Sequence, residues 1–456
     1  MPMTPRRRTA RLGTLALCCA LAGHAQANDL FTVNLAETGN PGNSLFVGSS
    51  SLPNMLERLA DQTGAFQSFN GVPFSASVSY AGVANAISIT YDPTGGANGG
   101  ELLTITDLAG TNATVAFDRA NGNLGNQIRD FFLRDDPDTL KRFLREMSRR
   151  SLVAVTDGNP LATTARSARY KFERLALHSD WTETENSLYN RFSIDHRAHE
   201  AYERAHRAGE TPGPDATPLG NLPVHKASTP VRTRFDFVAQ AIDADGFQGY
   251  SFDLNTSVEY VFTEHISGVF GVPLAYHEVE GADVFNGGFH LDMPVRIVMP
   301  EYGRTRGVTW LVTPGASMDW TGSTDFAAGG ILWSAGLSSA VIVHLDKLRL
   351  VASGQYTLHE GQKLKIDDYE FDPGVSQQIL KLGGKAVYSV AQKLDVYAGI
   401  TYTDFLRDAA VNNYWSPTAG VAFVFRNGAT ISVGYEGDFA DNFERHGGRV
   451  GVSLPF

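Results

Sequence analysis

The stretch GGRVGVSLPF, Gly447–Phe456, decides how the second half of this 456-residue chain folds. Apolar side chains occupy every second position, namely Val450, Val452, Leu454 and Phe456. The positions between them hold Arg449, Gly451 and Ser453. A period of two is typical of a β-strand with one apolar and one polar face. The printed sequence ends on the aromatic Phe456, and we interpret this stretch as the closing strand of a sheet.

The same alternation extends back to Val231. Phe235 and Phe237 alternate with Arg234 and Asp236, for example, and the pattern predicts about twelve strands. No apolar run after residue 27 approaches the roughly 18 residues that a membrane-spanning helix needs. An open sheet would leave unpaired backbone groups in lipid, so the chain can cross a membrane only as a closed barrel. We therefore predict an all-β, antiparallel transmembrane barrel over 231–456, with a smaller N-terminal α+β or helical region.

The connections between the predicted strands differ in length at the two ends. Short turns are expected at Asn427-Gly428, Gln392-Lys393, Asp346-Lys347 and Glu264-His265. Long loops are expected at Gly437–His446, Phe405–Pro417, Glu360–Gln377, Asp319–Phe326 and His277–Asn286. Short turns are typical of the periplasmic side of such barrels. Val231 and Phe456 then lie on that side, and the preceding region is expected in the periplasm or in the barrel lumen.

Residues 1–27 have the features of a secretory signal peptide. A basic segment with Arg6, Arg7 and Arg8 precedes a short apolar run, and Ala25-Gln26-Ala27 fits a cleavage site. The only cysteines, Cys18 and Cys19, fall inside this segment, so we expect no disulfide and no cysteine metal site in the mature chain. Removing four arginines leaves 34 basic against 49 acidic residues, a net charge of −15 that argues against nucleic-acid binding.

Two regions separate the signal peptide from the barrel. Residues 28–150 are predicted to form an α+β domain, periplasmic or acting as a plug, in which Pro137 begins an amphipathic helix that runs to Arg150. The other face of that helix is basic, and we weigh docking on acidic loop or lumen groups against an ordinary solvated face. Residues 151–230 are poorly patterned, end in a proline-rich stretch, and are interpreted as a linker.

A barrel with apolar residues outside has polar residues inside. The charged residues predicted to line the lumen are Arg232, Arg234, Asp236, Asp253, Glu259, Asp292, Arg296, Arg349, Lys381, Lys385, Asp395, Glu436 and Arg449. Such a lumen suits a water-filled path or a charged seal around a plug, while the simplest alternative is that these charges only pair with one another.

The sequence predicts no enzyme, no cofactor and no metal site. Ser339 and His344 lie on one predicted strand but on opposite faces, so they cannot form a nucleophile–base pair. His359 with Asp367 and Asp368 shares a predicted loop without a recognisable catalytic arrangement. His196, His199 and His206 match no standard ligand spacing.

The alternation, the turn asymmetry and the strand ending at Phe456 resemble Gram-negative outer-membrane β-barrel proteins, over 231–456. The resemblance implies an outer-membrane location, contact with the lipid bilayer, and recognition of Phe456 by the barrel assembly machinery. A second likeness is to functional-amyloid secretion channels, which are homotrimers of twelve-stranded barrels with a plug helix. It implies a plug at Asp136–Arg150, although here Asn28–Asp118 carries strands where those channels have a coiled coil.

Three functions follow as hypotheses. The first is an outer-membrane pore or secretion channel, for a solute or a polypeptide, that the N-terminal region gates or plugs. The second is an autotransporter-type barrel that anchors a short N-terminal passenger. The third is an outer-membrane enzyme. Protease treatment of intact cells separates the first two, because only an external passenger is cleaved.

Overall fold

The structure is a computed structural model that describes residues 29–131, 137–151, 160–172, 204–205, 208–209, 211, 231–263, 265–298, 306–323, 328–362, 364–366, 369–371, 375–391, 393–407, 409–425 and 429–455. The expected signal peptide, the terminal Phe456, the histidines His196, His199 and His206, and Asp367 and Asp368 lie outside the described residues.

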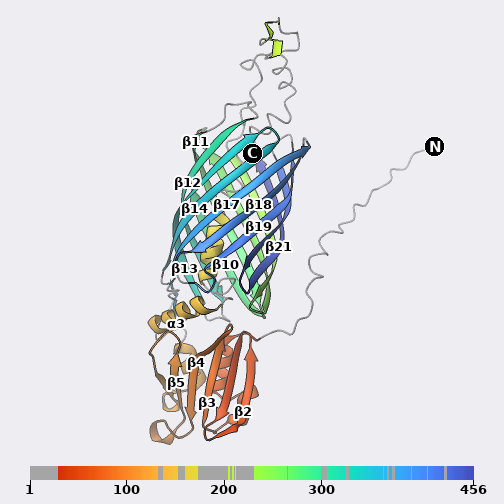
Figure 1. Cartoon of the computed structure of the whole chain (residues 1–456). Helices are drawn as coiled ribbons and strands as arrows, with labels where there is room; N and C mark the ends of the chain where they lie inside the picture. The colour runs from red at the N-terminus through yellow and green to blue at the C-terminus, as the bar shows by residue number, and fades with distance from the viewer. Residues whose placement is uncertain are drawn as a thin grey trace, which may run out of the picture.

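Twelve long antiparallel strands form a closed barrel (Figure 1). They are β7 (Val231–Ala244), β8 (Phe247–Val261), β9 (Ser267–Val279), β10 (Ala282–Asp292), β12 (Arg306–Ser323), β13 (Ala328–Leu345), β14 (Leu348–Gln362), β17 (Ser376–Ala391), β18 (Leu394–Phe405), β19 (Asn413–Val424), β20 (Thr430–Ala440) and β21 (Phe443–Pro455). The last strand pairs with the first, Val450 opposite Phe237, and β10 pairs with β12, with the short β11 (Val295–Val298) beside it. The predicted fold class is confirmed.

Side chains alternate across the barrel wall as the sequence predicts. On β7 the exposed fraction is 45% for Phe237 and 4% for its neighbour Asp236. The exposed large hydrophobic residues come from every strand of the ring and include Phe252, Leu274, Phe289, Leu350 and Val433. The outer surface is therefore apolar and the interior polar, which is the arrangement of a barrel surrounded by lipid.

The barrel has two ends, which we call the base and the mouth. The base carries the start of β7, the end of β21 and the tight Asp346-Lys347 turn. The mouth carries two-residue turns at 245–246, 280–281 and 441–442, each with a residue of positive φ. The long loops predicted at His277–Asn286 and Gly437–His446 are therefore wrong. The polar residues in these two stretches belong to strands that continue to the turn. The prediction failed because a polar residue that faces the lumen cannot be told from a loop residue in the sequence.

A separate sheet forms the N-terminal domain. Its strands are β1 (Phe31–Glu37), β2 (Asn40–Ser49), β3 (Phe74–Tyr80), β4 (Val83–Asp92), β5 (Leu102–Leu108) and β6 (Val115–Asp118), all antiparallel in the order β2-β1-β3-β4-β5-β6. The helices are α1 (Leu52–Ala60), α2 (Leu124–Asp130) and α3 (Pro137–Arg150), with short 3-10 turns at Gly64–Phe69, Ala97–Gly99 and Arg119–Asn121. The helix predicted to begin at Pro137 is confirmed as α3.

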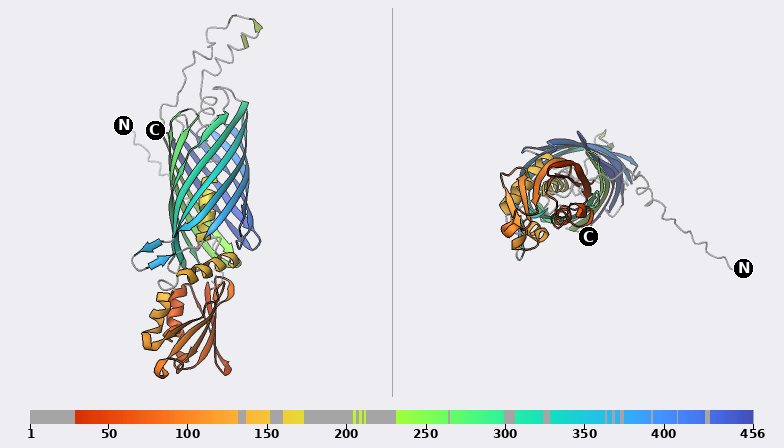
Figure 2. Two further views of the ribbon diagram at one scale, coloured as in Figure 1. Left: turned by 90° about the vertical axis from the view of Figure 1, so that its left-hand side faces the viewer. Right: turned by 90° about the horizontal axis from the view of Figure 1, so that it is seen from below.

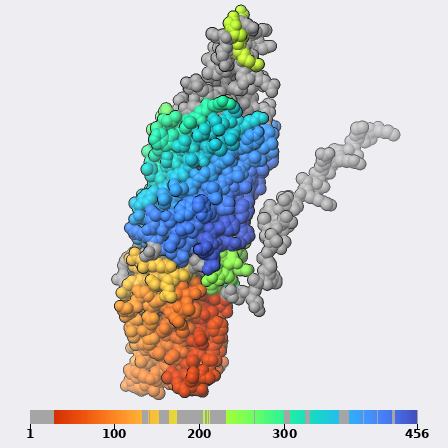
Figure 3. Space-filling model, in the orientation of Figure 1, coloured from red at the N-terminus to blue at the C-terminus, as the bar shows by residue number. Residues whose placement is uncertain are grey.

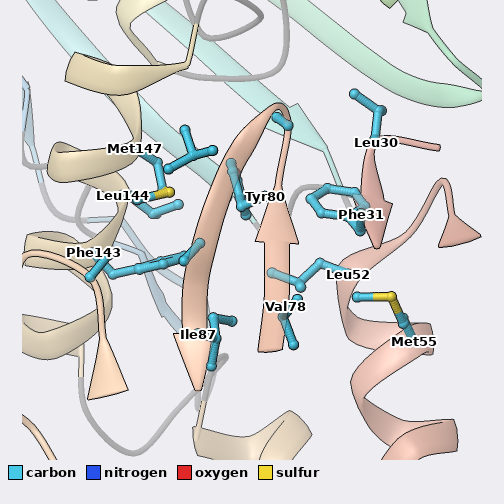
Figure 4. Packing of buried hydrophobic residues seen from close by; sticks show 14 of the residues in the cluster. Leu30, Phe31, Leu52, Met55, Val78, Tyr80, Ile87, Phe143, Leu144 and Met147 are labelled. Atoms are coloured by element: carbon cyan, nitrogen blue, oxygen red, sulfur yellow. The ribbon is translucent and has the colours of Figure 1, made fainter. Parts of the chain in front are cut away.

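The apolar side of α3 closes the core of this domain. Phe143 packs edge-on against Tyr80, with ring centroids 5.5 Å apart, and Leu144 and Met147 are buried beside them (Figure 4). Burial in this cluster raises the pKa of the Tyr80 hydroxyl above its ordinary value, because the ionised form loses its hydration.

The domain packs against the mouth of the barrel (Figures 1 and 3). A Cβ on Gly82, which has φ +84°, would lie 3.0 Å from the ring of Phe247 on β8. Apolar residues of both parts, including Phe31 and Leu52 from the domain and Ile242 and Phe443 from the barrel, form one buried cluster. The domain therefore packs on the end of the barrel opposite to Val231, and the expected location in the periplasm or the lumen stays a prediction.

A further helix, α5 (Pro160–Phe172), lies inside the barrel, where it is visible between the strands in Figure 1. It falls in the region 151–230 that the sequence analysis treats as linker, so that interpretation is wrong for these residues. Within the described residues, no helix combines the length and apolarity required to cross a membrane.

We expect Phe143→Ala to destabilise the N-terminal domain by about 3–5 kcal/mol, because it removes a fully buried aromatic ring and leaves a cavity. The measurement is denaturant unfolding of the domain within the full chain, with protease resistance as the readout. The matched control is Phe46→Ala, which removes a ring that is 67% exposed and should change the unfolding free energy by less than about 1 kcal/mol. Equal losses in the two variants would contradict the packing described here.

Candidate functional site: a helix held inside the barrel

The helix α5 runs from the mouth towards the base. Ala165 belongs to the apolar cluster at the mouth, together with Ile242 and Ala244. Phe172 packs with Leu311 and with Ile342, which is three residues from the end of β13 at the base. The helix therefore begins at the mouth, on which the N-terminal domain packs, and runs towards the end where β7 begins.

Arg169 is the central charged contact of the helix. Its guanidinium is paired with Glu436 and lies 3.4 Å from Asp438 Oδ2, both on β20, and it donates to Gln240 Oε1 at 3.3 Å. Both carboxylates are also bound by wall residues, since Arg449 lies 3.5 Å from Glu436 and Arg445 is paired with Asp438. Buried carboxylates need such partners, because an unpaired charge in this environment is costly.

A second polar cluster lies further around the wall. Ser167 Oγ donates to Asp319 Oδ2 at 2.8 Å and lies 3.3 Å from Ser317 Oγ. His290 Nε2 lies 2.8 Å from the other oxygen of Asp319. Asp319 therefore connects the helix to β10 and β12.

Arg166 fixes the mouth-proximal part of the helix. Its Nε lies 3.3 Å from Asp253 Oδ1 and its Nη2 lies 3.2 Å from His277 Nδ1. These contacts join α5 to β8 and β9.

The last turn of α5 combines polar and apolar contacts. Tyr170 Oη donates to the Thr256 carbonyl at 2.9 Å, and Lys171 Nζ donates to Ser334 Oγ at 2.8 Å. The ring of Phe172 fits against Gly383, where a Cβ would come within 2.9 Å of the ring. The carbonyl of Ala168 accepts from Gln355 Nε2 at 2.8 Å, so the wall also binds the helix backbone.

The structure places the thirteen charged residues predicted to line the lumen as follows. Ten are buried, namely Arg232, Asp236, Asp253, Asp292, Arg296, Arg349, Lys381, Asp395, Glu436 and Arg449. The other three, Arg234, Glu259 and Lys385, are half-buried. Of the thirteen, Asp253 and Glu436 pair with α5.

Several of the remaining predicted residues pair with one another. Arg234 and Arg449 both bind Asp236, at 2.6 and 3.1 Å. Arg349 binds Asp395 at 2.8 Å, and Arg296 lies 3.5 Å from Glu259. Lys381 donates to Thr403 Oγ1 at 2.6 Å. These residues therefore fit the simplest alternative, in which the lumen charges only pair with one another. The residues that contact α5 fit the other alternative, a charged seal around a plug.

Sequence reasoning missed the helix side of the central contacts and part of the wall side. Arg166, Arg169 and Lys171 lie in the supposed linker, and Asp319, Asp438 and Arg445 lie in the supposed loops. One signal was available, because α5 contains three cations and no acid in thirteen residues and would complement an acidic wall.

The enzyme candidates of the sequence are not brought together in the described residues. Ser339 accepts from Trp310 Nε1 at 3.0 Å, whereas His344 lies 3.1 Å from Thr309 Oγ1. His359 is buried on β14 beside Thr357. In the described part of the chain no three His, Cys, Asp or Glu side chains are grouped as metal ligands.

Comparison with known proteins gives structural matches only. No protein-family model and no curated protein sequence matches the chain. The barrel is similar to the translocator domain of the autotransporter NalP from Neisseria meningitidis, at 14% identity and TM-score 0.36, covering 50% of this chain and 89% of that one. It is also similar to the transport unit of the autotransporter AIDA-I from Escherichia coli, at 12% identity and TM-score 0.36, covering 57% and 99%.

A porin gives a match of the same kind. The NanC porin is 11% identical with a TM-score of 0.32, covering 49% of this chain and 100% of that one. The strand pairings themselves establish the closed barrel. The homotrimer and the recognition of Phe456 by the assembly machinery stay predictions.

We expect a disulfide to form when Ser167 and Ser317 are both changed to cysteine, because their hydroxyl oxygens lie 3.3 Å apart. The described chain contains no other cysteine, so the measurement is a mobility shift on non-reducing gels of the purified, oxidised protein. The control pairs Ser167→Cys with Ser453→Cys, a buried serine near the base end of β21. Efficient bridging in the control, or none in the test pair, would contradict the seating of α5.

Proposed function

We propose that this protein is an outer-membrane anchor that displays its N-terminal domain outside the cell, with α5 as the segment that passes through the barrel. This is the autotransporter-type hypothesis of the sequence analysis. The observation that carries it is the direction of the chain. The domain lies at the mouth, α5 runs through the lumen, and β7 starts at the base.

The apolar exterior supports the membrane location. In outer-membrane barrels with an even strand number, both ends of the barrel sequence lie on the periplasmic side. By that rule the base faces the periplasm and the mouth faces outwards. The N-terminal domain, which packs on the mouth, is then external, in contrast to the periplasmic position first expected.

The contacts of α5 support a permanent tether rather than a transient one. Removing one member of a buried ion pair costs about 3–5 kcal/mol, because it leaves the other charge without a partner. Arg169 and Arg166 each engage such buried carboxylates, on the strands β20 and β8, which lie three strands apart in the ring. The helix therefore both closes the lumen and holds the domain to the mouth.

The second candidate function is a pore that α5 plugs. The observation in its favour is the lumen itself, in which many buried polar and charged side chains surround the helix. Both functions use the same helix. They differ in whether α5 leaves the lumen while the domain remains attached.

We expect the topology to be measurable with single cysteines. Ser68→Cys places a thiol on an exposed turn of the domain, and Lys347→Cys places one on the exposed turn at the base. Cys18 and Cys19 are changed to alanine in both variants. A membrane-impermeant maleimide should label Ser68→Cys on intact cells and Lys347→Cys only after the outer membrane is opened. Labelling of Lys347→Cys alone on intact cells would place the domain in the periplasm.

We expect deletion of residues 160–172 to raise the single-channel conductance of the protein in planar bilayers well above that of the intact chain, because α5 fills the lumen. The matched control is Arg166→Gln, Arg169→Gln and Lys171→Gln together, which keeps the helix but removes its three cations. For a tether, this variant should give rare, brief openings. Frequent voltage-dependent openings of the unmodified protein would favour the plugged pore.

A further inference from the structure

The exposed side of α3 is strongly basic. Its apolar residues Phe143, Leu144 and Met147 are buried in the domain, whereas Arg142, Arg145, Arg149 and Arg150 are exposed. Arg142, Arg145 and Arg149 are spaced by three and four residues, so they lie along one side of the helix, and Arg150 flanks them. The helix α5 is not part of this surface, because it lies in the lumen.

The positive charge of the domain is concentrated on α3. Between residues 29 and 130 there are nine acids and three bases, 3 − 9, or a net charge of −6. Between residues 137 and 150 there are two acids and five bases, 5 − 2, or a net charge of +3. An anionic surface would therefore repel the acidic residues 29–130 of the domain but attract the helix α3.

The helix also lies at the level where a membrane surface would be. It sits between the sheet of the domain and the rim of the mouth (Figures 1 and 2). In the view along the barrel axis, the helical side of the domain extends beyond the ring of strands (Figure 2, right). Outward-facing aromatic residues near this rim include Trp333 and Trp415, each 50% exposed, and such residues mark the headgroup region of a bilayer.

We propose that the basic side of α3, defined by Arg142, Arg145, Arg149 and Arg150, docks on the phosphate groups of the lipid leaflet around the mouth. Arginine binds phosphate through paired N–H donors, which suits a layer of fixed phosphates better than a single free anion. The contact holds the domain upright on the barrel, with its acidic body directed away from the membrane. It requires that the barrel spans a bilayer, but not that the mouth faces outwards.

The experiment compares the full chain in nanodiscs of phosphatidylcholine with the full chain in nanodiscs that contain lipid A. Amide hydrogen exchange of residues 137–150 is the readout. Each cation beside an anionic surface strengthens attraction about fivefold, so exchange of α3 should be slowed at least about fivefold by lipid A at low salt. In 1 M salt the Debye length falls to about 3 Å, and the difference should disappear.

Two variants test the assignment. Arg142→Gln, Arg145→Gln and Arg149→Gln together should abolish the effect of lipid A, and Arg58→Gln, Arg119→Gln and Arg129→Gln together should preserve it. The second set removes the same charge from exposed positions on the body of the domain. Identical exchange in both kinds of nanodisc, or an effect that survives the first set, would overturn the proposal. Inorganic phosphate reproducing the effect in phosphatidylcholine discs would overturn it too, by showing an anion site without a membrane contact.

The outcome is independent of the proposed display function. Nanodiscs have the same lipids in both leaflets, so the docking test gives the same result whichever side the mouth faces in the cell. Only the cysteine labelling reports that side.

Discussion

The pairing of buried charge between α5 and the barrel wall is the constraint on which the rest of this structure depends. Closing twelve strands into a ring directs polar side chains inwards, and the lumen becomes a place where a charge without a partner is costly. Glu436, Asp438, Asp253 and Asp319 are buried there. The helix brings Arg166, Arg169 and Ser167 to them, and so the wall and the helix complete each other.

This constraint also fixes the course of the chain. A helix whose first turns meet the mouth and whose last residue packs near the base can be connected to the domain only at the mouth. The domain then packs its own core against the hairpins of the mouth, with Phe247 against Gly82 and Phe443 in the shared apolar cluster. Lumen, helix and domain form a continuous series of contacts.

The apolar and polar faces of the barrel have different tasks. The outer face makes the barrel compatible with lipid. It constrains residue identity only weakly, because any large apolar side chain is suitable at most of its positions. The inner face is specific, since ion pairs such as Arg349–Asp395 join particular residues on different strands. Small residues contribute where a ring must approach the backbone, as at Gly383 beneath Phe172. The distribution of charge in the domain adds a third level, because it separates a basic helix from an acidic body.

The sequence by itself determined the barrel. The period of two from Val231 onwards is a local property, since alternation along one strand already tells which side chains face lipid, and residues such as Phe237 and Asp236 followed it. The predicted helix at Pro137 was likewise local, because Pro137 and the apolar stripe lie within fourteen residues. The burial of ten of the thirteen charged positions follows the same local pattern.

Only the tertiary structure decided what those charges meet and where the domain lies. The segment 160–172 has a weak pattern of its own, because a helix surrounded on all sides by a polar wall has no single apolar stripe to reveal it. Polar residues such as His277 and Asp438 looked like loop residues for the same reason, as their partners lie on other strands. The end of the barrel on which the domain packs depends on the path of α5 through the lumen. That path is set by contacts between residues far apart in the sequence, such as Arg169 and Glu436, which are 267 positions apart.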